Sequence, residues 1–117
     1  LRELVAGGAE VILSQTNNAD FGYSDETYQQ AGIAQLRAIE TGRAVVNIST
    51  VGLSAIYLPT GKVLSELTWS QEGAMVEKVP LLNGTTPAML LGQTFEFANM
   101  IAAIGFLFVF GIRRKRR

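Results

Sequence analysis

The chain has 117 residues, with ten basic and ten acidic side chains, no Cys and no His. This length allows one domain at most, and the missing Cys and His exclude disulfides, thiol chemistry, zinc or haem sites built on those ligands, and Ser-His or Cys-His catalysis by this chain. Residues 113–117 hold half of the positive charge, which leaves five basic against ten acidic side chains, a net charge of −5, in residues 1–112. This distribution argues against nucleic-acid binding, which needs positive charge spread over a face.

The first two elements are predicted to be the end of a helix and a buried strand. Residues 1–6 mix apolar and charged side chains as the last turns of a helix do, and Gly7 and Gly8 end it. Because the chain starts at Leu1 inside this pattern, without a signal peptide, we expect a fragment of a longer protein. The continuous apolar run at residues 11–13 predicts a strand that is covered on both faces, as in α/β layers.

The next element is predicted to be a helix over residues 25–41. Ser24 is the candidate N-cap, Asp25 and Glu26 place negative charge in the first turn, and Gly42 ends the helix. One apolar stripe recurs at helical spacing and is expected to be buried; it consists of Tyr28, Gly32, Leu36 and Ile39.

Four further β-rich runs are predicted to be strands, at residues 44–48, 53–58, 63–67 and 74–79. The turn residues Pro59-Thr60-Gly61 join the second and third of these runs in a hairpin. A loop over residues 81–87 then leads to the last element.

Residues 88–112 contain one charged side chain, Glu96, and are predicted to form a transmembrane helix. As a helix, these 25 residues would rise about 38 Å, which exceeds the ~30 Å hydrocarbon core, so the span is placed near residues 90–112. Five cations follow directly at residues 113–117, which favours a cytoplasmic C-terminus and an extracytoplasmic region over residues 1–87. The alternatives are a buried helix of a soluble protein and, for the basic residues, a nuclear localisation signal.

Several motifs, taken in their order along the chain, resemble the back half of a nitrilase-like, or carbon–nitrogen hydrolase, domain. They are GAEVIL at residues 8–13, TNNADFG at 16–22, RAIETGR at 37–43, GLSAI at 52–56, PTGKVL at 59–64 and GTTP at 84–87. Followed by an apolar helix and a basic tail, they are similar to the apolipoprotein N-acyltransferase family over nearly the whole chain. The implied fold is the C-terminal portion of a nitrilase-like α-β-β-α sandwich, over residues 1–87, followed by one transmembrane helix over 88–112 and a basic cytoplasmic tail over 113–117.

The resemblance implies a two-step acyl transfer that needs no cofactor and no metal. In that family a Cys thiolate takes a fatty acyl chain from a phospholipid and passes it to the N-terminal amine of a diacylglyceryl-cysteine apolipoprotein, with a Glu as general base and a Lys beside the oxyanion. This sequence has no Cys, so no catalytic residue is assigned to it. The implied partners are therefore the phospholipid donor, the apolipoprotein acceptor and the bilayer, in a multi-pass protein of the bacterial cytoplasmic membrane.

Candidate substrate-binding residues follow the strand at residues 11–13, because functional groups commonly gather at the carboxyl ends of strands in open α/β sheets. They are Asn17, Asn18, Asp20 and Phe21. The Asn pair is equally consistent with turn chemistry, and for Phe21 packing against the helix is favoured over ligand contact. The resembled family commonly has an aromatic residue at the position of Asp20, and Asn-Asn-Gly at residues 50–52, where this chain has Thr-Val-Gly. Arg37 and Glu40 are expected to pair on one helix face in a scaffold role.

Two other functional classes fit parts of the sequence. A soluble amidase of the same superfamily would share the core motifs but lack the apolar span. A membrane-anchored binding domain without chemistry would account for the anchor and for the missing nucleophile. Upstream sequence that encodes further apolar spans and a Cys would favour the acyltransferase.

Overall fold

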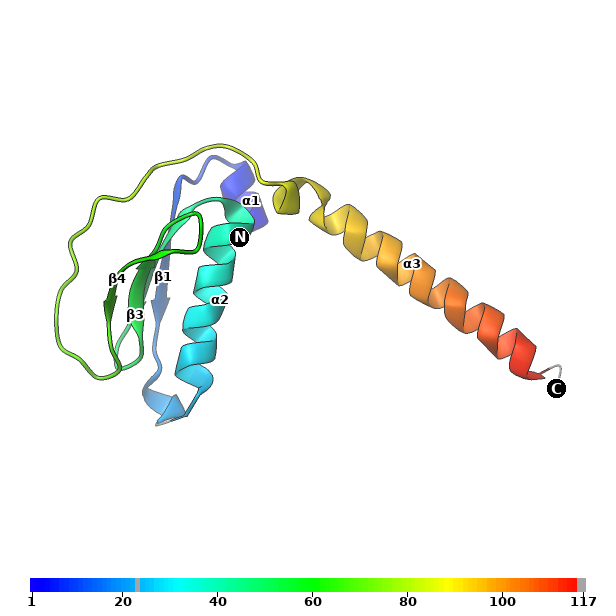
Figure 1. Ribbon diagram of the computed structural model, residues 1–117, viewed down its shortest axis with the longest axis horizontal. Helices are drawn as coiled ribbons and strands as arrows, with labels where there is room; N and C mark the ends of the chain where they lie inside the picture. The colour runs from blue at the N-terminus through cyan, green and yellow to red at the C-terminus, as the bar shows by residue number, and fades with distance from the viewer. Residues whose placement is uncertain (23, 116–117) are drawn as a thin grey trace. The chain divides into compact units, whose positions relative to one another are not determined.

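The computed structural model describes residues 1–22 and 24–115. The chain divides into two compact units, Leu1–Thr86 and Pro87–Arg117, of which the first holds the sheet and the second is a helix. In the first unit, helix α2 (Glu26–Thr41) lies along one face of a mixed sheet (Figure 1). The predicted α/β fold class is therefore confirmed.

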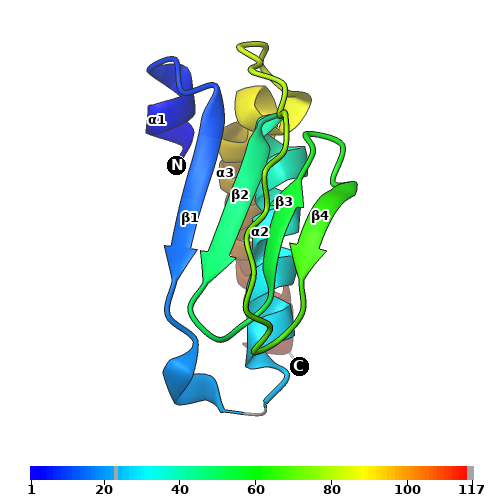
Figure 2. The same cartoon turned by 90° about the vertical axis from the view of Figure 1, so that its left-hand side faces the viewer.

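The sheet contains four strands in the order β1-β2-β3-β4 (Figure 2). β1 (Val11–Thr16) and β2 (Ala44–Ser49) run parallel, since α2 carries the chain back between them. β3 (Ser54–Tyr57) and β4 (Val63–Leu67) follow as antiparallel neighbours. Gly61, at φ +81°, turns the chain between these two strands. The four strands predicted before residue 70 and the hairpin are confirmed.

Both helices predicted in this unit are also present. The first, α1 (Arg2–Ala6), ends at Gly7. The second, α2, starts one residue later than predicted, with Asp25 at the N-cap position, while the Ser24 Oγ accepts a hydrogen bond of 3.4 Å from the Glu26 N–H. Gly42 closes α2 in the left-handed conformation at φ +64°, as glycine does at helix ends.

The core lies between α2 and one face of the sheet, and small helix residues build it. Ala34 and Ala38 pack against Val45, Ala55 and Tyr57, with the half-buried Ile12 alongside. The apolar stripe predicted to be buried was wrong: Tyr28 is 57%, Leu36 65% and Ile39 50% exposed. Alanine lets the helix backbone approach the sheet closely, so the small-residue face is buried and the neighbouring bulky face is left outside.

The opposite face of the sheet is open at β1 and β2, whereas Ile56 on β3 is only 5% exposed. Leu13 on β1 is 70% and Ile48 on β2 is 48% exposed, so the prediction that the first strand is covered on both faces is not met within these residues. Residues 71–86 cross this face as an extended segment without helix or strand (Figures 1 and 2). The strand predicted at residues 74–79 was therefore wrong, because no strand in the described part of the chain pairs with it.

The second unit is helix α3 (Pro87–Lys115). Its segment Pro87–Phe108 is long and apolar enough to cross a membrane, and none of that segment is buried within the chain. The helix predicted at residues 88–112 is thus confirmed as a helix. Its backbone continues into the predicted basic tail as far as Lys115, whereas Arg116 and Arg117 lie outside the described residues.

Candidate functional site

Two loops meet where the parallel strands β1 and β2 end. The Thr50 N–H donates a hydrogen bond of 3.3 Å to the Thr16 carbonyl, and the Thr50 hydroxyl donates one of 2.7 Å to the Asn17 Oδ1. The same Asn17 oxygen accepts a 3.2 Å hydrogen bond from the Ala19 N–H. Asn17 is exposed, and its amide nitrogen makes no hydrogen bond within the described part of the chain. This nitrogen is therefore a donor that faces outward at the strand ends.

Unlike Asn17, Asn18 points into the protein, where its side chain fixes the loop to α2. Its side chain is 2% exposed, and its Nδ2 donates a 3.3 Å hydrogen bond to the hydroxyl of Thr27, in the first turn of α2. Its Oδ1 has no hydrogen-bond donor among the residues that the structure describes. Gly52 lies directly against Asn18: a Cβ at position 52 would stand 2.7 Å from the Asn18 Nδ2 and 2.6 Å from the Ser49 Oγ. The loop after β2 therefore leaves no room for a side chain at residue 52, where it packs against the loop after β1.

The remaining two predicted residues lie on a short 3-10 turn, η1 (Ala19–Phe21). Asp20 is exposed and Phe21 is half-buried, with the Phe21 N–H bonded to the Asn18 carbonyl at 3.1 Å. The four predicted residues therefore share one loop but differ in role: Asn17 and Asp20 face out, Asn18 faces in, and Phe21 lies between.

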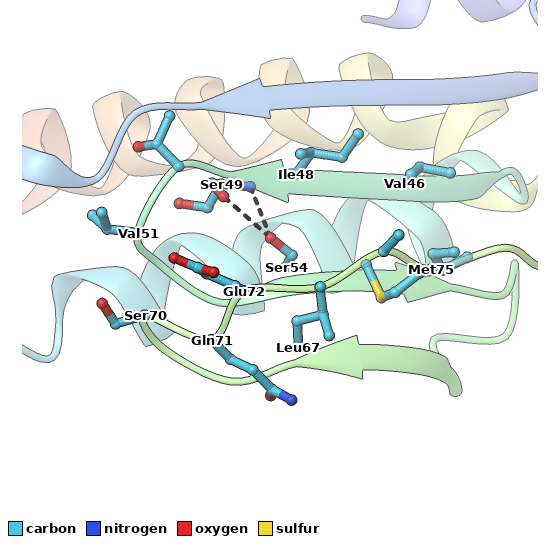
Figure 3. Close-up of a pocket in the computed structure, with 14 residues that line it drawn as sticks. Val46, Ile48, Ser49, Val51, Ser54, Leu67, Ser70, Gln71, Glu72 and Met75 are labelled. Carbon is cyan, nitrogen blue, oxygen red and sulfur yellow. Dashed lines mark hydrogen bonds between the residues drawn. The ribbon is translucent and has the colours of Figure 1, made fainter.

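A groove of about 690 Å³ begins at the same strand ends and runs along the open face of the sheet (Figure 3). Its apolar lining consists of Val46, Ile48, Val51, Ile56, Leu67 and Met75, and its polar lining of Ser49, Thr50, Ser54, Ser70, Gln71 and Glu72. Ser49 and Ser54 are tied together, since the Ser54 Oγ accepts from the Ser49 N–H at 3.0 Å and donates to the Ser49 carbonyl at 3.3 Å.

Sequence reasoning missed this groove. Its outer wall is the segment at residues 70–75, which is held at its start by the Ser70 N–H donating 2.9 Å to the Val51 carbonyl. Two segments far apart in sequence thus create the cavity, and neither carries a local pattern that marks it. A signal in the sequence was the apolar content of β2 and β3, because consecutive apolar residues place Val46 and Ile56 on this face as well as Val45 and Ala55 in the core.

The groove and the loop offer groups that can bind a ligand. The chain has no Cys and no His, and the described residues contain no group of three metal-binding side chains. What the arrangement offers is an apolar surface with polar hydrogen-bonding groups at one end.

The charged pair predicted on α2 lies at the opposite end of the sheet. Glu40 accepts hydrogen bonds from Arg37 and, at 3.3 Å, from Arg2 on α1, so the predicted Arg37–Glu40 pair is confirmed. Partial burial alone would raise the pKa of Glu40, but the hydrogen bonds and charges of Arg37 and Arg2 outweigh it and lower that pKa below its usual value. Through Arg2, Glu40 also ties α1 to α2, away from the loop.

Comparison with known protein families identifies the family to which this chain belongs. The sequence model of carbon–nitrogen hydrolases matches residues 1–85, which is the greater part of the chain. The chain belongs to the carbon–nitrogen hydrolase family. The family predicted from the motifs is thereby confirmed.

This carbon–nitrogen hydrolase chain is similar to several relatives that share one name. It is 32% identical over 117 residues, its whole length, to the apolipoprotein N-acyltransferase of Shewanella oneidensis. It is 38% identical over 107 residues to that of Gloeobacter violaceus and 33% over 108 residues to that of Mycolicibacterium smegmatis, or 91% and 92% of the chain. The chain spans only 22%, 20% and 18% of these three relatives, about a fifth of their length. The predicted resemblance to apolipoprotein N-acyltransferases is confirmed, and the likeness extends beyond the sheet into α3.

Proposed function

We propose that this chain is part of a membrane N-acyltransferase that completes lipoproteins. The observation that carries this proposal is the similarity along the whole chain to relatives named apolipoprotein N-acyltransferase, because that alignment joins the carbon–nitrogen hydrolase sheet to the apolar helix. A soluble amidase of the same family would account for the sheet but not for a helix of this length and composition.

The reaction proposed for the longer protein has two steps. A Cys thiolate attacks the ester carbonyl carbon of a phospholipid, the ester C–O bond breaks, and the lysophospholipid leaves as an alcohol after taking a proton. The α-amine of a diacylglyceryl-cysteine peptide then attacks the thioester, an amide forms, and the thiol is released. The Cys, the general-base Glu and the oxyanion-binding Lys are placed outside these 117 residues, which contain no Cys.

The role proposed for this chain is to form one wall of the acyl-transfer site and to anchor it. The loop that carries Asn17, Asn18, Asp20 and Phe21 is proposed to border the substrate pocket. Of these, Asn17 is best placed for direct contact, because its amide nitrogen is an outward-facing donor, while the buried Asn18 holds the loop.

The proposed location is the bacterial cytoplasmic membrane, with α3 as one of its spans. Residues 1–87 would lie outside the cytoplasm and residues 113–117 inside, in accord with the positive-inside rule. The phospholipid donor, the apolipoprotein acceptor and the bilayer are then the partners.

The test is to express the longer protein with its upstream sequence and incubate it in membranes with radiolabelled phospholipid. We expect a hydroxylamine-sensitive acyl adduct that is discharged when a diacylglyceryl-cysteine peptide is added. This 117-residue chain, treated in the same way, should form no adduct, since it lacks a thiol. An adduct on this chain, or none on the longer protein while it is folded, would contradict the proposal.

A single-residue prediction follows for Asn17. Asn17→Asp keeps the oxygen that accepts from Ala19 and Thr50 but removes the outward-facing donor. If that donor binds substrate in the transition state, removing it should cost about 1–3 kcal/mol of transition-state stabilisation. The transfer rate per folded molecule should then fall roughly 5- to 150-fold. Gln29→Glu is the matched control, because it makes the same amide-to-carboxylate change on the exposed side of α2. An unchanged rate for Asn17→Asp would show that this residue serves only the turn.

A further inference from the structure

The chain contains five Asn residues, and the fold restrains them to different degrees. Asn is a labile residue, because the main-chain nitrogen of the next residue can attack its side-chain Cγ and close a five-membered succinimide ring. That attack needs a main chain that can rotate, a side-chain amide without hydrogen bonds, and little bulk on the next residue. The surroundings of each Asn therefore decide whether it reacts.

Four of these Asn residues are restrained. Asn18 and Asn47 are each 2% exposed, and each donates a hydrogen bond from its Nδ2. Asn99 lies within helix α3, and its Nδ2 donates a hydrogen bond of 2.9 Å to a carbonyl one turn earlier. Asn17 is exposed, but its Oδ1 accepts two hydrogen bonds. Each of the four is also followed by a residue that carries a side chain, so none is well placed for ring closure.

Asn83 meets all three conditions. It is exposed and lies in the extended segment at residues 71–86, which has no helix or strand (Figure 2). Neither its side chain nor the Gly84 N–H is hydrogen-bonded to a residue that the structure describes. Because Gly84 has no side chain, its main-chain nitrogen is open to approach by the Asn83 Cγ.

The main chain is fixed directly after this pair and free before it. The guanidinium of Arg43, a residue that is 2% exposed, donates a hydrogen bond of 2.7 Å from Nη1 to the Gly84 carbonyl. Residues 72–83, in contrast, make no main-chain hydrogen bond to any residue in the described part of the chain. The attacking nitrogen of Gly84 is thus held in place, while Asn83 can rotate its Cγ onto it.

We propose that Asn83 and Gly84 form a site of spontaneous deamidation in the folded protein. The Gly84 nitrogen loses its proton to hydroxide and bonds to the Asn83 Cγ. The Cγ–Nδ2 bond then breaks, and the side-chain nitrogen leaves as ammonia with a proton from water, which regenerates the hydroxide. Water opens the ring on either side, which gives aspartate or, where the main chain then runs through the former side chain, isoaspartate. This modification does not depend on the proposed acyltransferase function.

The fold can accommodate both products. Isoaspartate adds one carbon to the main chain, which lengthens it by about 1.5 Å. The segment before Asn83 has no main-chain hydrogen bonds to lose, so it absorbs this length, and the Arg43–Gly84 hydrogen bond is retained. We therefore expect folded molecules to be modified without unfolding.

The experiment incubates the longer protein in mildly alkaline buffer, folded in detergent or unfolded in denaturant, and follows each Asn by peptide mass spectrometry. Segments without protective structure open at almost no free-energy cost, so Asn83 should convert in the folded protein within about threefold of its rate in the unfolded protein. Synthetic peptides with aspartate or isoaspartate at position 83 identify the two products. The buried Asn18 and Asn47 should stay unmodified in the folded protein.

Gly84→Ala is the decisive variant, because a Cβ at this position meets no described atom within 4 Å but obstructs ring closure. It should slow the conversion of Asn83 about tenfold, which corresponds to about 1.4 kcal/mol of activation free energy. Gly32→Ala is the matched control, since it makes the same change within α2, also without a close contact, and should leave the rate unchanged.

Two results would overturn the proposal. One is a rate for Asn83 in the folded protein more than about tenfold below the rate in the unfolded protein, which would show that the segment has to open before it reacts. The other is an equal rate in Gly84→Ala and the parent protein, which would show that ammonia is not lost through attack by the Gly84 nitrogen.

Discussion

Leu13→Ala is expected to cost the complete carbon–nitrogen hydrolase domain about 2–5 kcal/mol of unfolding free energy, and Leu13→Asp to prevent its folding. Leu13 is 70% exposed in this chain, where its loss alone would cost little. With the exposed Ile48 and the half-buried Val46, it forms an apolar surface on the open side of the sheet. Parallel strands of α/β proteins are normally covered on both faces, so the upstream part of the domain is expected to cover this surface.

The measurement is the thermal unfolding of the longer protein in detergent, with resistance to protease as the readout of the folded state. Thr60→Asp is the control, because it introduces the same carboxylate at an exposed turn residue between β3 and β4. A change of less than about 0.5 kcal/mol for Leu13→Ala, as is usual at surface positions, would mean that nothing covers this side of the sheet.

Residues 113–117 are expected to decide the orientation of α3. Five cations directly after an apolar segment hold that end in the cytoplasm, because Lys and Arg cross a membrane poorly. A C-terminal reporter that is active only outside the cytoplasm should stay silent in the unmodified protein. Replacing all five residues with Gln should raise its activity strongly, since Glu96 is then the only charge left after residue 87.

The control for this prediction replaces Lys62, which lies 25 residues before the first residue of α3, with Gln. That change should leave the reporter silent. Reporter activity in the unmodified protein would place the basic tail outside the cytoplasm and reverse the proposed topology.

Where sequence reasoning was wrong, packing between elements decided the outcome. The periodic stripe of Tyr28, Leu36 and Ile39 was predicted to be buried, yet Ala34 and Ala38 face the sheet instead. Periodicity identifies a helix with apolar faces, but the distance between the helix and the sheet decides which face packs. Likewise, residues 74–79 have the composition of a strand, but a strand needs a neighbour, and no such neighbour lies in the described part of the chain.

The candidate site, too, was predictable only in part from the sequence. Its loop after β1 was predictable, because functional groups gather at strand ends in α/β folds. The opposite orientations of Asn17 and Asn18 were not, since they depend on Thr50 and Thr27, which reach the loop from other elements. The groove beside it likewise depends on residues 70–75 returning across the sheet.

The sequence by itself determined the local features of this protein: the strands, the two helices closed by Gly7 and Gly42, the apolar helix after Pro87 and the family motifs. These follow from backbone preferences and from hydrophobic patterns within a few residues. Only the tertiary structure decided that Arg43 is buried against the carbonyls of Ala9 and Gly84, and that Gly52 closes on Asn18. Such contacts join residues far apart in the chain, where burial and hydrogen-bond geometry act through space and leave no periodic trace in the sequence.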